Sequence, residues 1–128
     1  MKEVIGKVKD KAAGDTDVLA VYLFGSRVRE DFSPVSDFDI CLILFPGECA
    51  GKGISEKRLE YVKMFNGKTD IQVFRQLPLY IRVRILKEGE VIFCRNEDLL
   101  YETAFKTIRE FNDFEHIYRE YLEEVLNG

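Results

Sequence analysis

Two stretches of sequence decide the fold, VLAVYLFGSR at residues 18–27 and SDFDICLILF at residues 36–45. The first opens with seven apolar, partly β-branched residues, a composition typical of a buried strand, and it ends abruptly at Gly25 and Ser26. The second is apolar after its opening aspartates, and Pro46 follows it. The two stretches therefore predict two buried strands, with a glycine-serine turn at the end of the first.

Helices and strands alternate along the rest of the chain. The hydrophobic periodicity predicts helices over 2–12, 56–65 and 98–126, and strands over 69–74 and 91–94. Residues 78–87 fit either period, and Pro78 before them and Gly89 after them favour a helix. A further short helix is expected to begin within 26–31. This alternation predicts an α/β (α+β) fold, with a mixed sheet of about four strands flanked by helices.

Two places in the predicted helices carry finer signals. Ser55 is the predicted N-cap of the helix that follows it, because its hydroxyl can accept a backbone N–H bond there. Ile54 and Leu59 then occupy the two positions of a hydrophobic staple, and Leu59 also belongs to the apolar stripe of that helix. The helical tail is expected to bend or break at Asn112 and Asp113.

Length and composition limit the class of protein. The chain has 128 residues, of which 46% are hydrophobic and 33% charged, as in a folded globular domain. We expect one domain over 1–128, with a core over about 18–95 and a helical tail over about 98–126. The apolar runs are too short to cross a bilayer, and residues 1–10 lack the apolar core of a signal peptide. We therefore expect a cytoplasmic protein with no membrane partner.

Charge and cysteine content exclude several kinds of site. The net charge of −4 argues against direct nucleic-acid binding, which needs a basic face, although bound metal ions could still hold a nucleotide. The three cysteines are odd in number and form no CxxC pair, which argues against a disulfide framework or a zinc site. The single histidine, His116, is expected to be a partly exposed helix residue.

Carboxylates cluster around the two decisive stretches. Asp37 and Asp39 are two residues apart on a predicted strand, so they point to the same face. Asp70 opens the next predicted strand and can join them if the two strands are neighbours. Such a cluster is costly unless a cation neutralises it, and Mg²⁺ prefers carboxylate and phosphate oxygens. Three carboxylates can hold two Mg²⁺ ions for in-line attack on a phosphorus.

The turn beside these carboxylates suits a phosphate. Gly25 lets the backbone approach a ligand closely, and Ser26 and the N–H groups at the start of a helix can bind a phosphate oxygen. Arg27 can add a charge-assisted hydrogen bond. An Asp-x-Asp or a Gly-Ser pair alone is common in loops and caps, so the prediction depends on their combination at this spacing.

These residues resemble a known catalytic pattern. Gly25-Ser26, Asp37-x-Asp39 and Asp70 are similar to the motif of nucleotidyltransferases of the DNA polymerase beta superfamily, over about residues 18–95. The chain is most similar to the minimal nucleotidyltransferase (MNT) group of small prokaryotic proteins, which its helical tail also resembles. The resemblance implies the polymerase-beta-like nucleotidyltransferase fold.

The resemblance also implies roles. Asp37, Asp39 and Asp70 would be the catalytic residues and would ligate two Mg²⁺ ions, with Asp70 helping to deprotonate the acceptor. Gly25 and Ser26, with Arg27 beside them, would bind the nucleoside triphosphate. Members of the group are often paired with a small helical HEPN-type toxin, and they act as antitoxins by transferring AMP from ATP to a toxin tyrosine.

Two other functions stay open at the level of sequence. The chain could be a binding module that masks its partner without catalysis, or it could transfer a nucleotide to a small molecule. The acceptor, the base of the nucleotide and the choice between homo- and hetero-oligomers are not determined. The tail holds six Phe and Tyr residues between acidic ones. We expect most of these aromatic residues to cover the sheet, with room for some to anchor an interface.

Overall fold

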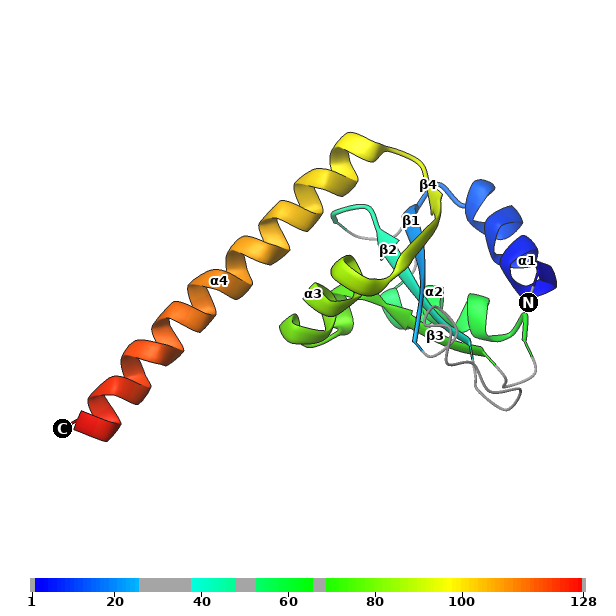
Figure 1. Ribbon diagram of the computed structural model, residues 1–128. Helices are drawn as coiled ribbons and strands as arrows, with labels where there is room; N and C mark the ends of the chain where they lie inside the picture. The colour runs from blue at the N-terminus through cyan, green and yellow to red at the C-terminus, as the bar shows by residue number, and fades with distance from the viewer. Residues whose placement is uncertain (1, 26–37, 48–52, 66–68, 128) are drawn as a thin grey trace.

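The computed structural model describes residues 2–25, 38–47, 53–65 and 69–127. Figure 1 shows the elements, which in chain order are α1 (Lys2–Ala13), β1 (Val18–Phe24), β2 (Phe38–Leu44), α2 (Ile54–Val62), β3 (Thr69–Val73), the 3₁₀ turn η1 (Phe74–Gln76), α3 (Leu79–Glu88), β4 (Glu90–Cys94) and α4 (Glu97–Asn127). The segment that fitted either period is a helix, α3, with Pro78 before its first residue and Gly89 after its last. The short helix predicted within 26–31 lies outside the described residues.

The four strands form one mixed sheet in the order β3-β2-β1-β4. The central strand β1 pairs antiparallel with both β2 and β4, whereas β2 and β3 are parallel. The parallel pair follows from the sequence, because α2 lies between the two strands and can carry the chain back to the same end of the sheet. The predicted mixed sheet flanked by helices is confirmed.

A hydrophobic core lies on each face of the sheet. On one face, Val21, Leu42 and Ile71 pack with residues of α1 and α2. On the other face, Tyr22 and Ile43 pack with residues of α3 and the start of α4. Alternate residues of each strand supply the two cores, as the pleat of a strand requires. The sheet is therefore covered on both faces, and β1 and β2 are buried along most of their length.

The start of α2 differs from the sequence prediction. The helix begins at Ile54 with Gly53 as its N-cap, and no side chain caps it. Ser55 therefore lies inside the helix, so the predicted serine cap and the staple of Ile54 with Leu59 are wrong. Leu59 is 47% exposed. The buried residues of α2 are Lys57 and Tyr61, which belong to an unpredicted ion cluster, and Ile54 and Val62 also pack against the core.

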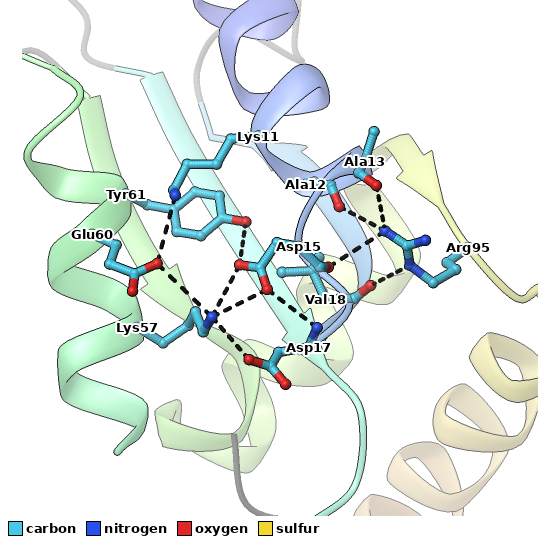
Figure 2. A network of polar contacts seen from close by, with 10 residues as sticks. All are labelled: Lys11, Ala12, Ala13, Asp15, Asp17, Val18, Lys57, Glu60, Tyr61 and Arg95. Carbon is cyan, nitrogen blue, oxygen red and sulfur yellow. Dashed lines mark hydrogen bonds and ion pairs between the residues drawn. The ribbon is translucent and has the colours of Figure 1, made fainter. Parts of the chain in front are cut away.

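That ion cluster joins α2 to the turn before β1 (Figure 2). The Lys57 ammonium group lies 3.1 Å from Asp15 Oδ1 and 2.9 Å from Asp17 Oδ2, and only 5% of the residue is exposed. The Tyr61 hydroxyl donates to Asp15 Oδ2 at 3.0 Å. Burial lowers the pKa of Lys57, but the hydrogen bonds from its ammonium group to Asp17 and Asp15 outweigh that effect and raise it. Lys57 is therefore a charged residue inside the fold.

Arg95, which follows β4, binds the same turn from the other side (Figure 2). Its Nη2 donates to the carbonyl oxygens of Ala12 at 2.8 Å and Ala13 at 3.0 Å, at the end of α1. Its Nε donates to Val18 O at 3.2 Å. The last carbonyls of a helix have no partner within the helix, so Arg95 completes the C-terminus of α1.

The tail is one unbroken helix of 31 residues, so the predicted break at Asn112 and Asp113 is wrong. Only its first half packs on the fold, and Figure 1 shows the rest extending away from the sheet toward the C-terminus. All residues from 112 to 127 are exposed. Tyr101, Phe105 and Phe114 are among the exposed aromatic residues, at 64%, 69% and 57%. The expectation that most tail aromatics cover the sheet is therefore wrong.

Two smaller expectations concern cysteines and membranes. Cys41 is buried, Cys94 is partly buried, and both are free thiols. Cys49 lies outside the described residues. Within the described ranges, no helix combines the length and hydropathy needed to cross a bilayer.

Candidate active site

Gly25 directly follows β1 and has a backbone conformation that favours glycine. Its φ is +97°, in the region that L-residues rarely adopt. A Cβ atom at this position would overlap the carboxylate of Asp39, including its Oδ2 atom. The backbone at the end of β1 therefore lies directly against that carboxylate. The close neighbour of Gly25 in the structure is thus Asp39, and the predicted approach of its backbone to a phosphate stays a prediction.

Asp39 lies near the start of β2. It belongs to a row of paired residues, Phe24, Asp39 and Asp70, that crosses three strands. It is the register partner of Phe24 in β1 and of Asp70 in β3. Residues directly opposite each other on paired strands project to the same face. The condition set by the sequence, that the third strand lies beside the second, is thus fulfilled, and the structure brings Asp39 and Asp70 together.

Asp70 lies on the open part of this face. The side chain is exposed, whereas its neighbours Thr69 and Ile71 point into the core. The Gln72 amide donates to Asp70 Oδ1 at 2.9 Å and to Oδ2 at 3.1 Å. The sequence analysis missed Gln72, although its place two residues after Asp70 on a strand puts both side chains on one face. Gln72 orients the carboxylate and leaves it accessible to solvent.

The other three predicted site residues, Ser26, Arg27 and Asp37, lie outside the described residues. Among the residues that the structure does describe, no group of three or more His, Cys, Asp or Glu side chains could hold a metal ion. The described part of the candidate site therefore consists of Gly25, Asp39 and Asp70.

Comparison with known proteins identifies the family. The family model described as polymerase beta, nucleotidyltransferase matches residues 6–98, which include both decisive strands and all the predicted site residues. The chain belongs to this nucleotidyltransferase family. The resemblance to the polymerase beta superfamily is therefore confirmed, as is the prediction of a nucleotidyltransferase enzyme.

A curated relative and two solved structures are similar to this nucleotidyltransferase. A Methanocaldococcus jannaschii protein, which carries the provisional name protein adenylyltransferase, is 34% identical over 104 residues, 80% of this chain and 77% of the relative. A chain in the crystal structure of a toxin-antitoxin with AMP-PNP aligns with a TM-score of 0.68 and 18% identity, over 95% of this chain and 98% of that one.

The second solved structure contains a tri-AMPylated HEPN toxin of Shewanella oneidensis in complex with an MNT antitoxin. It aligns with a TM-score of 0.64 and 16% identity, over 98% of this chain and 99% of that chain. At these identities the likeness establishes the fold, and it extends over nearly the whole nucleotidyltransferase. The predicted fold is confirmed along α4 as well as in the sheet.

The donor atoms of the described site suit a divalent cation. Asp39 and Asp70 present carboxylate oxygens on one face, and Mg²⁺ takes oxygen ligands, commonly one or two carboxylates together with substrate phosphates. Gly25 leaves space beside Asp39 that any side chain would fill. The described residues therefore fit the metal that the family implies.

The side chains beneath this row are apolar or neutral. Cys41 is two residues after Asp39 on the same face of β2, and burial raises the pKa of its thiol. Tyr22 is its register partner in β1, and burial, followed by the nearby Cys94 and Cys41, raises the pKa of its phenol. Both groups stay protonated at neutral pH and do not compete as ligands or nucleophiles. Among the described residues of β2 and β3, the carboxylates are therefore Asp39 and Asp70.

Proposed function

We propose that this nucleotidyltransferase transfers AMP from ATP to a hydroxyl group, a tyrosine, of a partner HEPN-type toxin, and thereby acts as its antitoxin. The observation that carries the proposal is the row of Asp39 and Asp70 across β2 and β3, with Gly25 against Asp39. Paired carboxylates beside an open backbone turn are suited to holding a metal-bound triphosphate. The name of the M. jannaschii relative supports the choice of a protein as the acceptor.

The partner is supported by the structures that share the fold. A chain of a toxin-antitoxin with AMP-PNP and a chain of an AMPylated HEPN toxin complex both align over almost all of this protein.

The metal ligands in this proposal are Asp37, Asp39 and Asp70. Two Mg²⁺ ions held there would neutralise the developing charge on the phosphates and on the acceptor oxygen. Asp39 is positioned by the pairing of β2 with both of its neighbours, and Asp70 by its bonds to Gln72. Two of the proposed ligands are therefore fixed by the sheet before any ligand binds, which lowers the cost of assembling the site.

The turn after β1 would hold the triphosphate. The backbone of Gly25, the hydroxyl of Ser26 and the guanidinium of Arg27 would bind the β- and γ-phosphates. The acceptor oxygen then forms a bond to the α-phosphorus, and the bond from that phosphorus to the bridging oxygen breaks. Pyrophosphate leaves with the bonding electrons, and Asp70 takes the proton of the acceptor hydroxyl.

The direct test is intact-mass spectrometry of a HEPN-type partner of this chain, the acceptor that the proposal requires, after incubation with ATP and Mg²⁺. We expect AMP adducts with the wild-type protein, and none, or at least about a thousandfold fewer per unit time, with Asp39→Asn. Asp10→Asn is the matched control, because it makes the same change at an exposed position of α1. It should transfer AMP at the wild-type rate.

Two outcomes would contradict the proposal. Adducts formed equally well by Asp39→Asn would exclude a role for this carboxylate. A stable complex without any adduct, neutralising the toxin equally well with Asp39→Asn, would instead establish a masking antitoxin. The long exposed face of α4 is the observation that favours this second function, because such a surface is typical of a binding element.

A further inference from the structure

The second half of α4 carries an apolar stripe that leaves the fold. Its members are spaced three and four residues apart, which places them on one side of a helix. We call them the α4 seam: Phe111, Phe114, Tyr118, Tyr121 and Val125. The last four are 57%, 51%, 59% and 59% exposed. The same row begins inside the fold, where Leu100 packs on the core and Thr107 is buried.

The seam is ordered as a helix without cover from the rest of the described chain. Phe114 and Tyr118 stack with their ring centroids 6.0 Å apart, and His116 and Glu120 are paired at 3.2 Å on another face. Pairs at this spacing add only a few tenths of a kcal/mol each. An apolar stripe of this length on a protruding helix is typical of a surface that packs against a second helix.

The charges beside the seam decide what kind of helix can cover it. The flanking positions are the residues just before Phe111, Tyr118 and Val125 and just after Phe114 and Tyr121. In the same order, these residues are Glu110, Ile117, Glu124, Glu115 and Leu122. Every charged residue among them is therefore acidic. The basic side chains of this part of the helix, Arg109 and Arg119, lie at other positions around it.

A second copy of this chain is a poor occupant. In a parallel pair joined through the seam, Glu110 of one copy would face Glu115 of the other. In an antiparallel pair centred on Ile117, Glu110 would face Glu124. Either arrangement places carboxylates against carboxylates at the edge of the interface, which is destabilising.

We infer that the α4 seam binds an amphipathic helix of a partner protein, whose apolar stripe is flanked by lysine and arginine side chains. The apolar stripe would cover Phe114, Tyr118 and Tyr121, and the basic flanks would pair with Glu110, Glu115 and Glu124. An open cavity of about 260 Å³ lies where α4 leaves the fold, with Phe74, Thr107 and Glu110 among its lining residues, and it can accept a side chain from the end of that helix.

This inference rests on the proposed function for its partner, a HEPN-type protein. The test measures the affinity of the purified partner for the full-length chain, wild type and Phe114→Asp/Tyr118→Asp. We expect the double variant to bind about a hundredfold more weakly or worse, because a buried aromatic anchor is commonly worth tenfold or more in affinity. Phe105→Asp is the matched control: it is an equally exposed aromatic of α4 outside the seam, and it should bind as the wild type does.

Charge reversal tests the chemistry of the partner surface. We expect Glu110→Lys/Glu115→Lys/Glu124→Lys to weaken binding at least about tenfold at low salt, and the wild-type complex to weaken as salt rises from about 0.1 M to about 0.5 M. Circular dichroism would establish that each variant remains helical, which its exposed position favours. Stronger binding by the charge-reversed variant would mean an acidic partner face and would overturn the inference.

Other outcomes would distinguish a failure of the proposed docking surface from a failure of the proposed AMP transfer. Unchanged affinity of Phe114→Asp/Tyr118→Asp, or no complex with the wild type, would overturn the docking surface. A wild-type dimer in sedimentation that the same double variant abolishes would assign the seam to a second copy. If the seam variant loses binding while the wild-type complex forms no AMP adduct, the docking surface holds and the proposed transfer fails.

Discussion

At the residue scale, the site depends on the contact between Gly25 and Asp39. The glycine combines a positive φ with a position where a Cβ would overlap the carboxylate. Gly47 has a closely similar φ, +100°, but a Cβ there would meet nothing within 4 Å. Substitutions at the two glycines therefore separate two effects. One is the cost of a side chain at positive φ, and the other is the displacement of Asp39, the proposed metal ligand.

We expect Gly25→Ala and Gly47→Ala to share a loss of roughly 1–2 kcal/mol in the free energy of unfolding, because each places a Cβ at positive φ. Only Gly25→Ala should also slow AMP transfer, by about a hundredfold, because it displaces the Asp39 carboxylate. Urea unfolding and intact-mass assays of both variants would measure this. Equal activity of the two variants would show that the contact with Asp39 is not needed.

The sequence placed the Gly25 turn beside Asp39 without predicting their direct contact, and it predicted nothing of the buried ion cluster. Gly25, Asp39 and Asp70 could be found because turn chemistry and strand alternation are local properties of the chain. Lys57 could not, because a lysine is rarely buried and two of its carboxylate partners, Asp15 and Asp17, are about forty residues away in the sequence. Its burial depends on the packing of α2 against the turn before β1.

At the element scale, α4 consists of two parts with different roles. Its first half packs on α3 and on β1, whereas residues 112–127 are exposed. The sequence predicted the helix but not where it leaves the fold, because an apolar stripe has the same spacing whether it faces this chain or another. The misplaced N-cap of α2 has a similar cause, since Gly53 and Ser55 are both acceptable caps and tertiary contacts chose between them.

We expect a chain that ends at Phe111 to keep its stability, with a change below about 0.5 kcal/mol in the free energy of unfolding, because the removed residues bury nothing. A chain that ends at Asn96 loses all of α4 and uncovers α3, so it should lose several kcal/mol. Thermal and urea unfolding of both chains would measure the difference. Strong destabilisation of the longer chain would mean that the exposed half contributes to the fold.

At the scale of the whole molecule, the stability of the protein should fall at alkaline pH. The pKa of Tyr61 is raised by burial and then by Asp15, and the pKa of Lys57 is raised by its carboxylate partners against the effect of burial. Both pKa values in the folded state thus lie above those of the unfolded chain. Each group contributes stability that is complete below about pH 10 and is lost as the pH rises further.

We therefore expect the urea midpoint to decline first from about pH 8.5, where the buried thiol of Cys41 ionises in the unfolded chain, and to fall further above about pH 10 through Tyr61, Tyr22 and Lys57. Tyr61→Phe should make that fall shallower, because it removes one of the ionising groups. A midpoint that stayed constant to about pH 11, or a fall equally steep in Tyr61→Phe, would contradict the assignment to this cluster.

Arg95 has a mechanical consequence for the molecule. It ties the end of α1 and the start of β1 to the residue that precedes the root of α4, across about eighty residues of chain. These bonds lie at the opposite end of β1 from Gly25. The chain leading into α4 is thus fastened to the sheet at the end away from Asp39, so the exposed half of α4 can engage a partner without direct contact with the carboxylate row.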